Sequence, residues 1–231
     1  RATNPALWNG WKHGLLKDLF LLTRSKLNKD PIKTSKEIAS DRKANVLAFF
    51  NREQLDYINT YLELFDNEYF NKNNSGKLKW QTGLVLKEKV GEPVIGCRRC
   101  FENLIEIFIK VDNSEGLFLK LVQILDLSGL EVIDASISTS SNNRIAANTF
   151  ITKFSHHNRA LNSSELKEVR DRILNNFNSY SPFKKSSKKE KNLKSFKKVL
   201  YITNIEDELK QRNLLTIETL DSHGLLGKIA K

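Results

Sequence analysis

The chain has 231 residues, of which 39% are apolar, and this is enough for one or two domains with a real core. Its longest apolar runs are far shorter than a membrane span, and the N-terminus lacks a signal-peptide pattern, so we expect a soluble, cytoplasmic protein. Two cysteines in this length are typical of a reducing compartment and do not make a disulfide framework.

The net charge of +11 is concentrated in one stretch of the chain. Between Ser181 and Lys198, eight lysines accompany a single acid, Glu190, which gives this stretch a net charge of +7. Such runs are usually solvated linkers, and only Phe183 and Phe196 could stack on a base here. Binding to a nucleic acid or another polyanion is therefore the weaker interpretation, and a steep dependence on salt would reveal it.

The two ends of the chain suggest a fragment. Methionine is absent, even at position 1, so we expect Arg1 to be an internal residue of a longer protein. An amphipathic helix that has only just begun at Lys231 predicts the same of the other end. We therefore expect the function of the chain to be part of a larger function.

Residues 1–90 are predicted to be helical. Asn4-Pro5 is a typical helix start, and apolar residues then recur at three- and four-residue steps to about Leu27. Further helices are expected at about 35–50, 52–70 and 78–86, with a turn over the sequence "NKNNSGK". The aromatic residues of these helices are interpreted as packing residues.

From residue 91 onwards, strands alternate with helices. The apolar and turn patterns predict strands at 104–111, 132–139, 145–154 and 199–205, and helices at 117–125 and 163–177. The order βαββαβ is that of a ferredoxin-like domain. We therefore expect an α+β protein in which this domain covers residues 91–206, including the lysine-rich linker at 181–198.

One strand–loop–helix device occurs twice, as "IEIFIKVDNSEGLFLKLVQIL" and as "LLTIETLDSHGLLGKIAK". Asp112 corresponds to Asp221, and Gly116 corresponds to Gly224, 108 residues further on. A separation of this size suits whole domains. The sequence therefore predicts a second copy that begins at 213–231 and is truncated.

The repeated loop suggests a binding site. A strand that enters a helix through a tight glycine loop directs free backbone N–H groups at one point, where the helix dipole favours an anion. The carboxylate of a free amino acid could bind there, and an Asp at the strand end could take its ammonium group. The simpler alternative is that Asp caps the helix and Gly only supplies the turn. The candidate ligand-binding residues are Asp112, Ser114, Glu115, Gly116, Asp221, Ser222, His223 and Gly224.

The βαββαβ order with its D-x-x-G-L-L loop resembles the ACT domain, a small-molecule sensor that usually binds amino acids. The segments "NPALWNGWKHGLLKDLFLLTRSKL", "EPVIGCRRCFENLIEIFIKV" and "VIDASISTSSNNRIAANTFIT" extend the resemblance to the bifunctional uridylyltransferase/uridylyl-removing enzymes of the PII nitrogen-signalling system. It covers essentially the whole chain. It implies that residues 1–90 follow the phosphohydrolase domain and that the rest is one ACT domain and the start of another.

The resemblance implies a division of labour. In that family a nucleotidyltransferase domain attaches UMP to the PII signal protein, an HD-type phosphohydrolase domain removes it, and the ACT pair senses glutamine. Neither catalytic domain is represented here, so we expect a non-catalytic chain with no catalytic residues, metal site or cofactor of its own. The resemblance implies Mg²⁺ as the cofactor of the missing domains, glutamine as the effector and the PII signal protein as the partner. The alternative is an ACT scaffold for pairing or PII docking without ligand sensing.

Three features depart from a simple sensor. His223 replaces the proline that the family usually has before the loop glycine, and its loss would loosen the second loop. Glu115 adds negative charge where a carboxylate should bind. Cys97 and Cys100 have the spacing of a metal half-site or redox pair, and their flanking arginines could lower a thiol pKa. This last function is the weaker interpretation, because the segment looks extended and further ligands are few.

Overall fold

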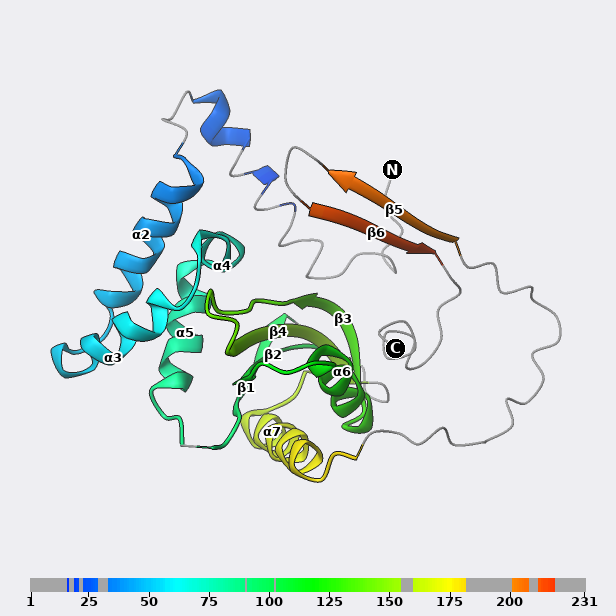
Figure 1. Cartoon of the computed structure of the whole chain (residues 1–231). Coiled ribbons are helices and arrows are strands. Elements are labelled where there is room, and N and C mark those ends of the chain that lie inside the picture. The colour runs from blue at the N-terminus through cyan, green and yellow to red at the C-terminus, as the bar shows by residue number, and fades with distance from the viewer. Residues whose placement is uncertain are drawn as a thin grey trace.

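A computed structural model of the chain describes residues 16, 19–20, 23–28, 33–89, 91–101, 103–154, 160–181, 201–207 and 212–218 (Figure 1). Of the first predicted helix, it describes residues 16, 19–20 and 23–27, and these are helical. The second predicted loop, at 221–224, lies outside the described residues, as does most of the lysine-rich linker. In the part of the chain that is described, no helix is both long and apolar enough to cross a membrane.

From residue 33 to the sheet, the described chain forms the helices α2 (Ser35–Leu47), α3 (Arg52–Glu63), α4 (Asn67–Lys72) and α5 (Ser75–Val85). The prediction of one helix over 52–70 is wrong, because the side chain of Asp66 accepts a hydrogen bond from the Tyr69 N–H (3.1 Å) and starts α4 there. The turn expected over "NKNNSGK" is shorter than predicted. Asn74 accepts from the Lys77 N–H (2.8 Å), and this cap starts α5 within that segment.

The rest of the described chain forms a four-stranded antiparallel sheet with two helices. The strands are β1 (Val94–Phe101), β2 (Leu104–Asp112), β3 (Leu130–Ser136) and β4 (Ile145–Phe154), in the spatial order β1-β2-β4-β3. The helices are α6 (Leu117–Leu127) and α7 (Ser163–Asn178). The predicted α+β class is thus confirmed, and the four-stranded antiparallel sheet with its two helices is compatible with a domain of the ferredoxin-like type.

One strand departs from the predicted order. The strand expected at 199–205 is β5 (Tyr201–Asp207), and it pairs with β6 (Arg212–Glu218) in a separate two-stranded sheet. The place beside β2 is taken by β1, for which the sequence predicts an extended segment but no place in the sheet. Strands β1 and β2 pair antiparallel with Phe101 opposite Leu104, so this pairing joins segments that are close in sequence and costs little chain entropy.

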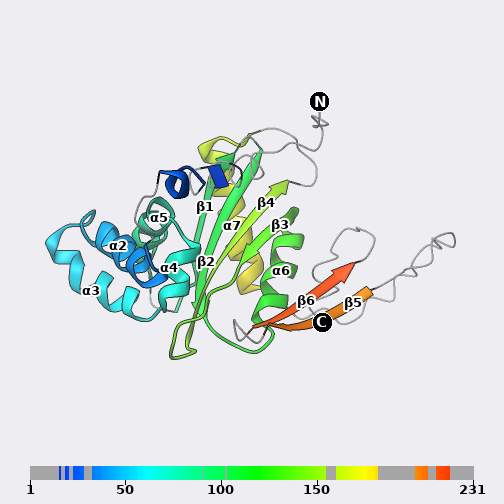
Figure 2. The ribbon, with the colours of Figure 1, turned by 90° about the horizontal axis from the view of Figure 1, so that it is seen from above.

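The four-stranded sheet lies between two layers of helices, with α6 and α7 on one face and the helical segment α2–α5 on the other (Figure 2). Strand β2 is buried at eight of its nine positions. Ile105, Ile107 and Ile109 belong to the core with α6 and α7. Phe108, on the opposite face, belongs to the core with the helical segment and lies edge-on to Trp80 of α5. One strand therefore contributes to both cores.

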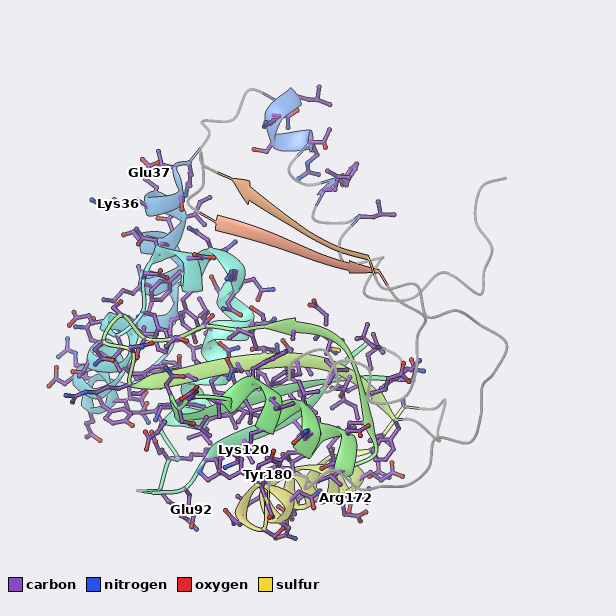
Figure 3. The ribbon with its side chains drawn as sticks, turned by 45° about the vertical axis from the view of Figure 1, so that its right-hand side comes forward. Lys36, Glu37, Glu92, Lys120, Arg172 and Tyr180 are labelled. Atoms are coloured by element: carbon purple, nitrogen blue, oxygen red, sulfur yellow. The ribbon has the colours of Figure 1, made fainter. Side chains whose placement is uncertain are left out.

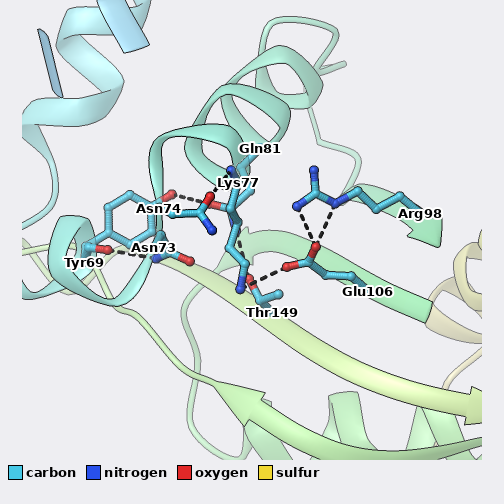
Figure 4. Close-up of polar contacts among 8 residues, drawn as sticks. All are labelled: Tyr69, Asn73, Asn74, Lys77, Gln81, Arg98, Glu106 and Thr149. Carbon is cyan, nitrogen blue, oxygen red and sulfur yellow. Dashed lines mark hydrogen bonds and ion pairs between the residues drawn. The ribbon is translucent and has the colours of Figure 1, made fainter. Parts of the chain in front are cut away.

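The face of β2 that meets the helical segment also carries a buried charge. Glu106 is 3% exposed, and Lys77 of α5 places its Nζ 2.9 Å from the Glu106 Oε1 (Figure 4). Arg98 of β1 binds the other oxygen, Oε2, through Nη2 at 2.6 Å and Nε at 2.7 Å. The Arg98 guanidinium also lies 4.1 Å from the Trp80 ring centroid, a cation–π contact. The carboxylate thus joins α5 to two strands.

Two further polar contacts cross the same interface. Gln81 of α5 donates from Nε2 to the Thr149 Oγ1 of β4 (2.9 Å), and its Oε1 accepts from the Tyr69 hydroxyl (2.9 Å) (Figure 4). Near the other end of β2, Lys110 forms an ion pair with Glu88, which follows α5. Gly96 of β1 permits the close approach of α5, because a Cβ there would lie 2.1 Å from a methyl carbon of Leu84.

We predict that Glu106→Gln lowers the free energy of unfolding by about 2–3 kcal/mol, because it leaves two partly buried cations without a counter-charge. Glu131→Gln is the matched control. Both side chains of its ion pair with Lys153 are exposed, so this pair should contribute less than about 1 kcal/mol to the free energy of unfolding. Urea unfolding of the whole chain measures both effects. Equal, small losses in the two variants would contradict a structural role for Glu106.

Candidate functional site

The candidate site is the turn between β2 and α6. Strand β2 ends at Asp112, and Gly116 is the N-cap of α6 with φ 69°, in the left-handed region. The Leu117 N–H donates to the Ser114 carbonyl oxygen (3.2 Å), which closes the turn. A Cβ on Gly116 would meet nothing within 4 Å, so glycine is favoured here by the backbone angle and not by lack of space.

This turn leaves donors without partners. Within the described residues, the backbone N–H groups of Ser114, Glu115 and Gly116 donate no hydrogen bond to the protein. The Gly116 cap has no side chain that could accept such bonds. Free N–H groups at a helix N-terminus, with the partial positive charge of the helix dipole, favour an anion. The first predicted loop therefore has the local geometry that a carboxylate requires.

Two hollows border the turn, and Ser114 lines both of them. The first has a volume of about 280 Å³ and lies on the side of β3 and β4, where Gly116, Ile137, Thr139 and Asn148 contribute to its lining. The second has a volume of about 240 Å³ and lies on the side of the segment that follows α5. We call these the Asn148 hollow and the Asp112 hollow, after one lining residue of each.

A polar side chain in the Asn148 hollow is both buried and unpaired. Asn148, in β4, one of the two central strands, is 2% exposed, and its side-chain Oδ1 has no hydrogen-bond partner among the described residues. It pairs in register with Ile109 of β2 and lies on the face of the sheet that carries α6. A buried amide without a partner costs about 1–3 kcal/mol, so a ligand that satisfies it would recover this free energy.

The Asp112 hollow is more highly charged. Asp112 lines it together with the buried Lys110 and its partner Glu88, and with Lys120 of α6. The Lys120 Nζ lies 3.8 Å from the Phe177 ring centroid and 5.5 Å from that of Tyr180 (Figure 3). The hollow therefore brings together the end of β2, the helices α6 and α7, and the segment that leaves the helical part of the chain.

The structure brings together three of the four candidate residues of the first loop at these hollows. Asp112 and Ser114 line one hollow, and Ser114 and Gly116 line the other. Glu115 is exposed and lines neither of the two. The second set, Asp221, Ser222, His223 and Gly224, lies outside the described residues. Sequence reasoning missed Asn148, although a lone asparagine inside the apolar strand "IAANTF" was a signal that could have found it.

The β3–β4 hairpin connects the turn to the helical segment. On one side, the Asn113 N–H donates to the Arg144 carbonyl oxygen (2.7 Å), and the Asn113 side chain donates to the Asn143 carbonyl oxygen (3.1 Å). On the other side, the Ser141 N–H donates to the carbonyl oxygen of Leu64, which follows α3 (2.7 Å). A chain of hydrogen bonds through the hairpin thus links the position of the turn to that of the helical segment.

The two cysteines of β1 differ in their surroundings. Cys97 packs against the core beneath α6 and α7, whereas Cys100 is exposed. Burial raises the pKa of the Cys97 thiol from 9.0 to about 12, and the charge of Arg170 offsets only part of this effect. A redox cysteine needs the opposite shift. Among the described residues, no three His, Cys, Asp or Glu side chains are grouped as they would be around a metal ion.

These features define the class of protein: an α+β domain that packs on a helical segment and whose β2–α6 turn has backbone N–H groups without acceptors among the described residues. Compared with known proteins, the chain is similar over its whole length to bifunctional uridylyltransferase/uridylyl-removing enzymes. It is 26% identical to that of Psychrobacter sp. (strain PRwf-1), covering 100% of this chain and 28% of the relative. The identity to the Vibrio atlanticus enzyme is 26%, covering 99% of this chain and 27% of the relative. The identity to the Azotobacter vinelandii enzyme is 25%, covering 100% of this chain and 27% of the relative.

The resemblance stated from the sequence is thereby confirmed, and the chain is homologous to part of these enzymes. It spans a little more than a quarter of the length of the curated relatives it matches. No family model and no solved structure matches the chain.

At pH 8 we predict that iodoacetamide modifies Cys100 at least about tenfold faster than Cys97, because thiolate is the reactive form and burial keeps the Cys97 thiol protonated. Mass spectrometry of the labelled peptides gives both rates. In urea the difference should vanish. Equal rates in the folded protein would contradict the buried environment of Cys97.

Proposed function

We propose that this chain is an amino-acid-sensing, regulatory part of a bifunctional uridylyltransferase/uridylyl-removing enzyme, and that glutamine is its effector. The observation that carries the proposal is the turn at Ser114–Gly116: its N–H groups donate to no acceptor among the described residues, and Ser114 and Gly116 line a hollow large enough for an amino acid. The names of the relatives support the choice of enzyme. In this proposal the catalytic steps, their Mg²⁺ and the contact with PII belong to the whole enzyme.

The lining residues suggest how a free amino acid would bind. Its carboxylate accepts hydrogen bonds from the N–H groups of the turn, next to the N-terminus of α6. A ligand seated on the Ser114 N–H has Asp112 on one side and Asn148 on the other, because Ser114 lines both hollows. The ammonium group then lies toward Asp112, and the side chain enters the Asn148 hollow. A zwitterion is thus accommodated without a basic side chain at the carboxylate.

Two connections could carry the effect of the ligand to the helical segment. One is the hairpin, which binds Asn113 on the turn and Leu64 after α3. The other is strand β4, in which Asn148 lines the hollow while the next residue, Thr149, accepts a hydrogen bond from Gln81 of α5. A ligand shifts the equilibrium between two arrangements only as far as it prefers one of them. The helical segment is the part through which we propose this preference is transmitted.

We predict that Gly116→Ala weakens glutamine binding at least about fivefold and lowers the free energy of unfolding by about 1 kcal/mol, because alanine resists a positive φ. Gly129→Ala is the matched control. Gly129 follows α6 with φ 77°, and an added Cβ there meets only ordinary contacts. It should lose similar stability and keep full affinity. Isothermal titration and urea unfolding of the whole chain measure both quantities.

Two results would contradict the proposal. If glutamine gives no heat with the unaltered chain at millimolar concentration, the chain does not sense it, and a scaffold that pairs subunits or docks PII becomes the better account. If both glycine variants bind glutamine as well as the unaltered chain, the ligand lies away from the turn.

A further inference from the structure

The Asn148 hollow contains an unmet hydrogen-bonding capacity that the turn does not explain. The carboxylate of an amino acid would satisfy backbone N–H groups, but the buried Oδ1 of Asn148 needs a donor. The hollow is also lined by Ile137 and Thr139, which follow β3, and by Ala146 of β4, and Leu117 is a buried apolar neighbour. Two amides line the hollow, but that of Asn113 already donates to the Asn143 carbonyl oxygen (3.1 Å), so Asn148 is the amide whose oxygen is left for a ligand. A polar group placed in this way among apolar neighbours fixes which ligand is accepted.

We infer that Asn148 determines the specificity of the site and selects a ligand with a primary carboxamide at the end of its side chain. This inference rests on the proposed function, since it assigns the ligand side chain to the Asn148 hollow. A side-chain amide offers an acceptor oxygen and an NH₂ donor, and a second primary amide offers the same two in reverse. The two groups can therefore satisfy each other with a pair of hydrogen bonds.

Ligand side chains without a primary carboxamide do not satisfy both hydrogen-bonding groups of Asn148. A carboxylate cannot donate to the Asn148 oxygen, and burying its charge beside a neutral amide is unfavourable. An apolar side chain would leave the amide unpaired. A site that hydrogen-bonds its ligand discriminates strongly against analogues that lack the bonding group. An apolar pocket discriminates much less between ligands that differ only in shape. The hollow, at about 280 Å³, has the volume of roughly nine water molecules, which is enough for an amino acid such as glutamine.

The test begins with ligands and the unaltered 231-residue chain. Isothermal titration compares glutamine with glutamate, which has the same length but no donor at its end, and with methionine, which is similar in length and apolar. We expect glutamine to bind at least about tenfold more tightly than either. Equal affinities for the three would overturn the inference and leave an unselective amino-acid site.

A pair of variants then tests the residue itself. Asn148→Leu should weaken glutamine binding at least about tenfold, whereas binding of methionine should be unchanged or tighter. It should also raise the Tm in the absence of ligand by about 2–4 °C, because it removes an unpaired buried amide. Thr152→Val is the matched control: Thr152 is fully buried on the same strand and face, bonds to the Ile105 carbonyl oxygen (3.3 Å) and lines neither hollow. It should keep glutamine affinity.

The outcomes separate this inference from the proposed function. If glutamine binds the unaltered chain and Asn148→Leu equally well, Asn148 does not read the ligand, although the turn could still bind it. If glutamine does not bind the unaltered chain, both the inference and the proposed function are wrong. A lowered Tm in Asn148→Leu, together with the same preference among the three ligands in this variant as in the unaltered chain, would also count against the inference.

Discussion

Strand β2 is the constraint on which the rest of the structure depends, because it is buried on both faces. Its odd-numbered residues complete the core with α6 and α7, and its even-numbered residues meet the helical segment. Phe108 fills that second face, and Glu106 anchors it with Lys77 and Arg98. A strand held from both sides cannot shift its register without breaking two cores. The turn that follows it is therefore fixed in position relative to the helices.

This double burial gives a physical reason why the proposed regulation can act at a distance. The turn at Ser114–Gly116 belongs to one layer, but the elements that border it reach the other layer within a few residues. Asn148 and Thr149 are neighbours in β4, and they face the hollow and α5 respectively. The hairpin contacts Asn113 and Leu64. Packed cores respond in discrete steps rather than by gradual deformation, so a small change at the turn could be passed on as a change in helix position.

Much of the fold, and the turn, could be predicted from the sequence, because they depend on patterns within short segments. Periodic apolar residues predicted α6, α7, β2 and β4, and the glycine that follows Asp112 in the loop "DNSEG" indicated the turn at Gly116, which has a left-handed φ. The break at Asp66 was missed because a cap competes with a continuous helical pattern. The position of β1 beside β2, the buried Glu106 and the unpaired Asn148 depend on contacts between distant segments. Periodicity within one segment contains no information about such contacts, although polar residues inside apolar strands mark where to expect them.

The central claim is that an amino acid at the turn acts on the helical segment through the sheet. Amide hydrogen exchange of the whole chain, with and without saturating glutamine, tests it most directly. The account predicts slower exchange at residues 113–119, and a change at Ser141 and in the turn of α5 around Gln81, with the far end of α7 unaffected. Protection confined to the turn would contradict the coupling. No change at the turn would contradict binding there.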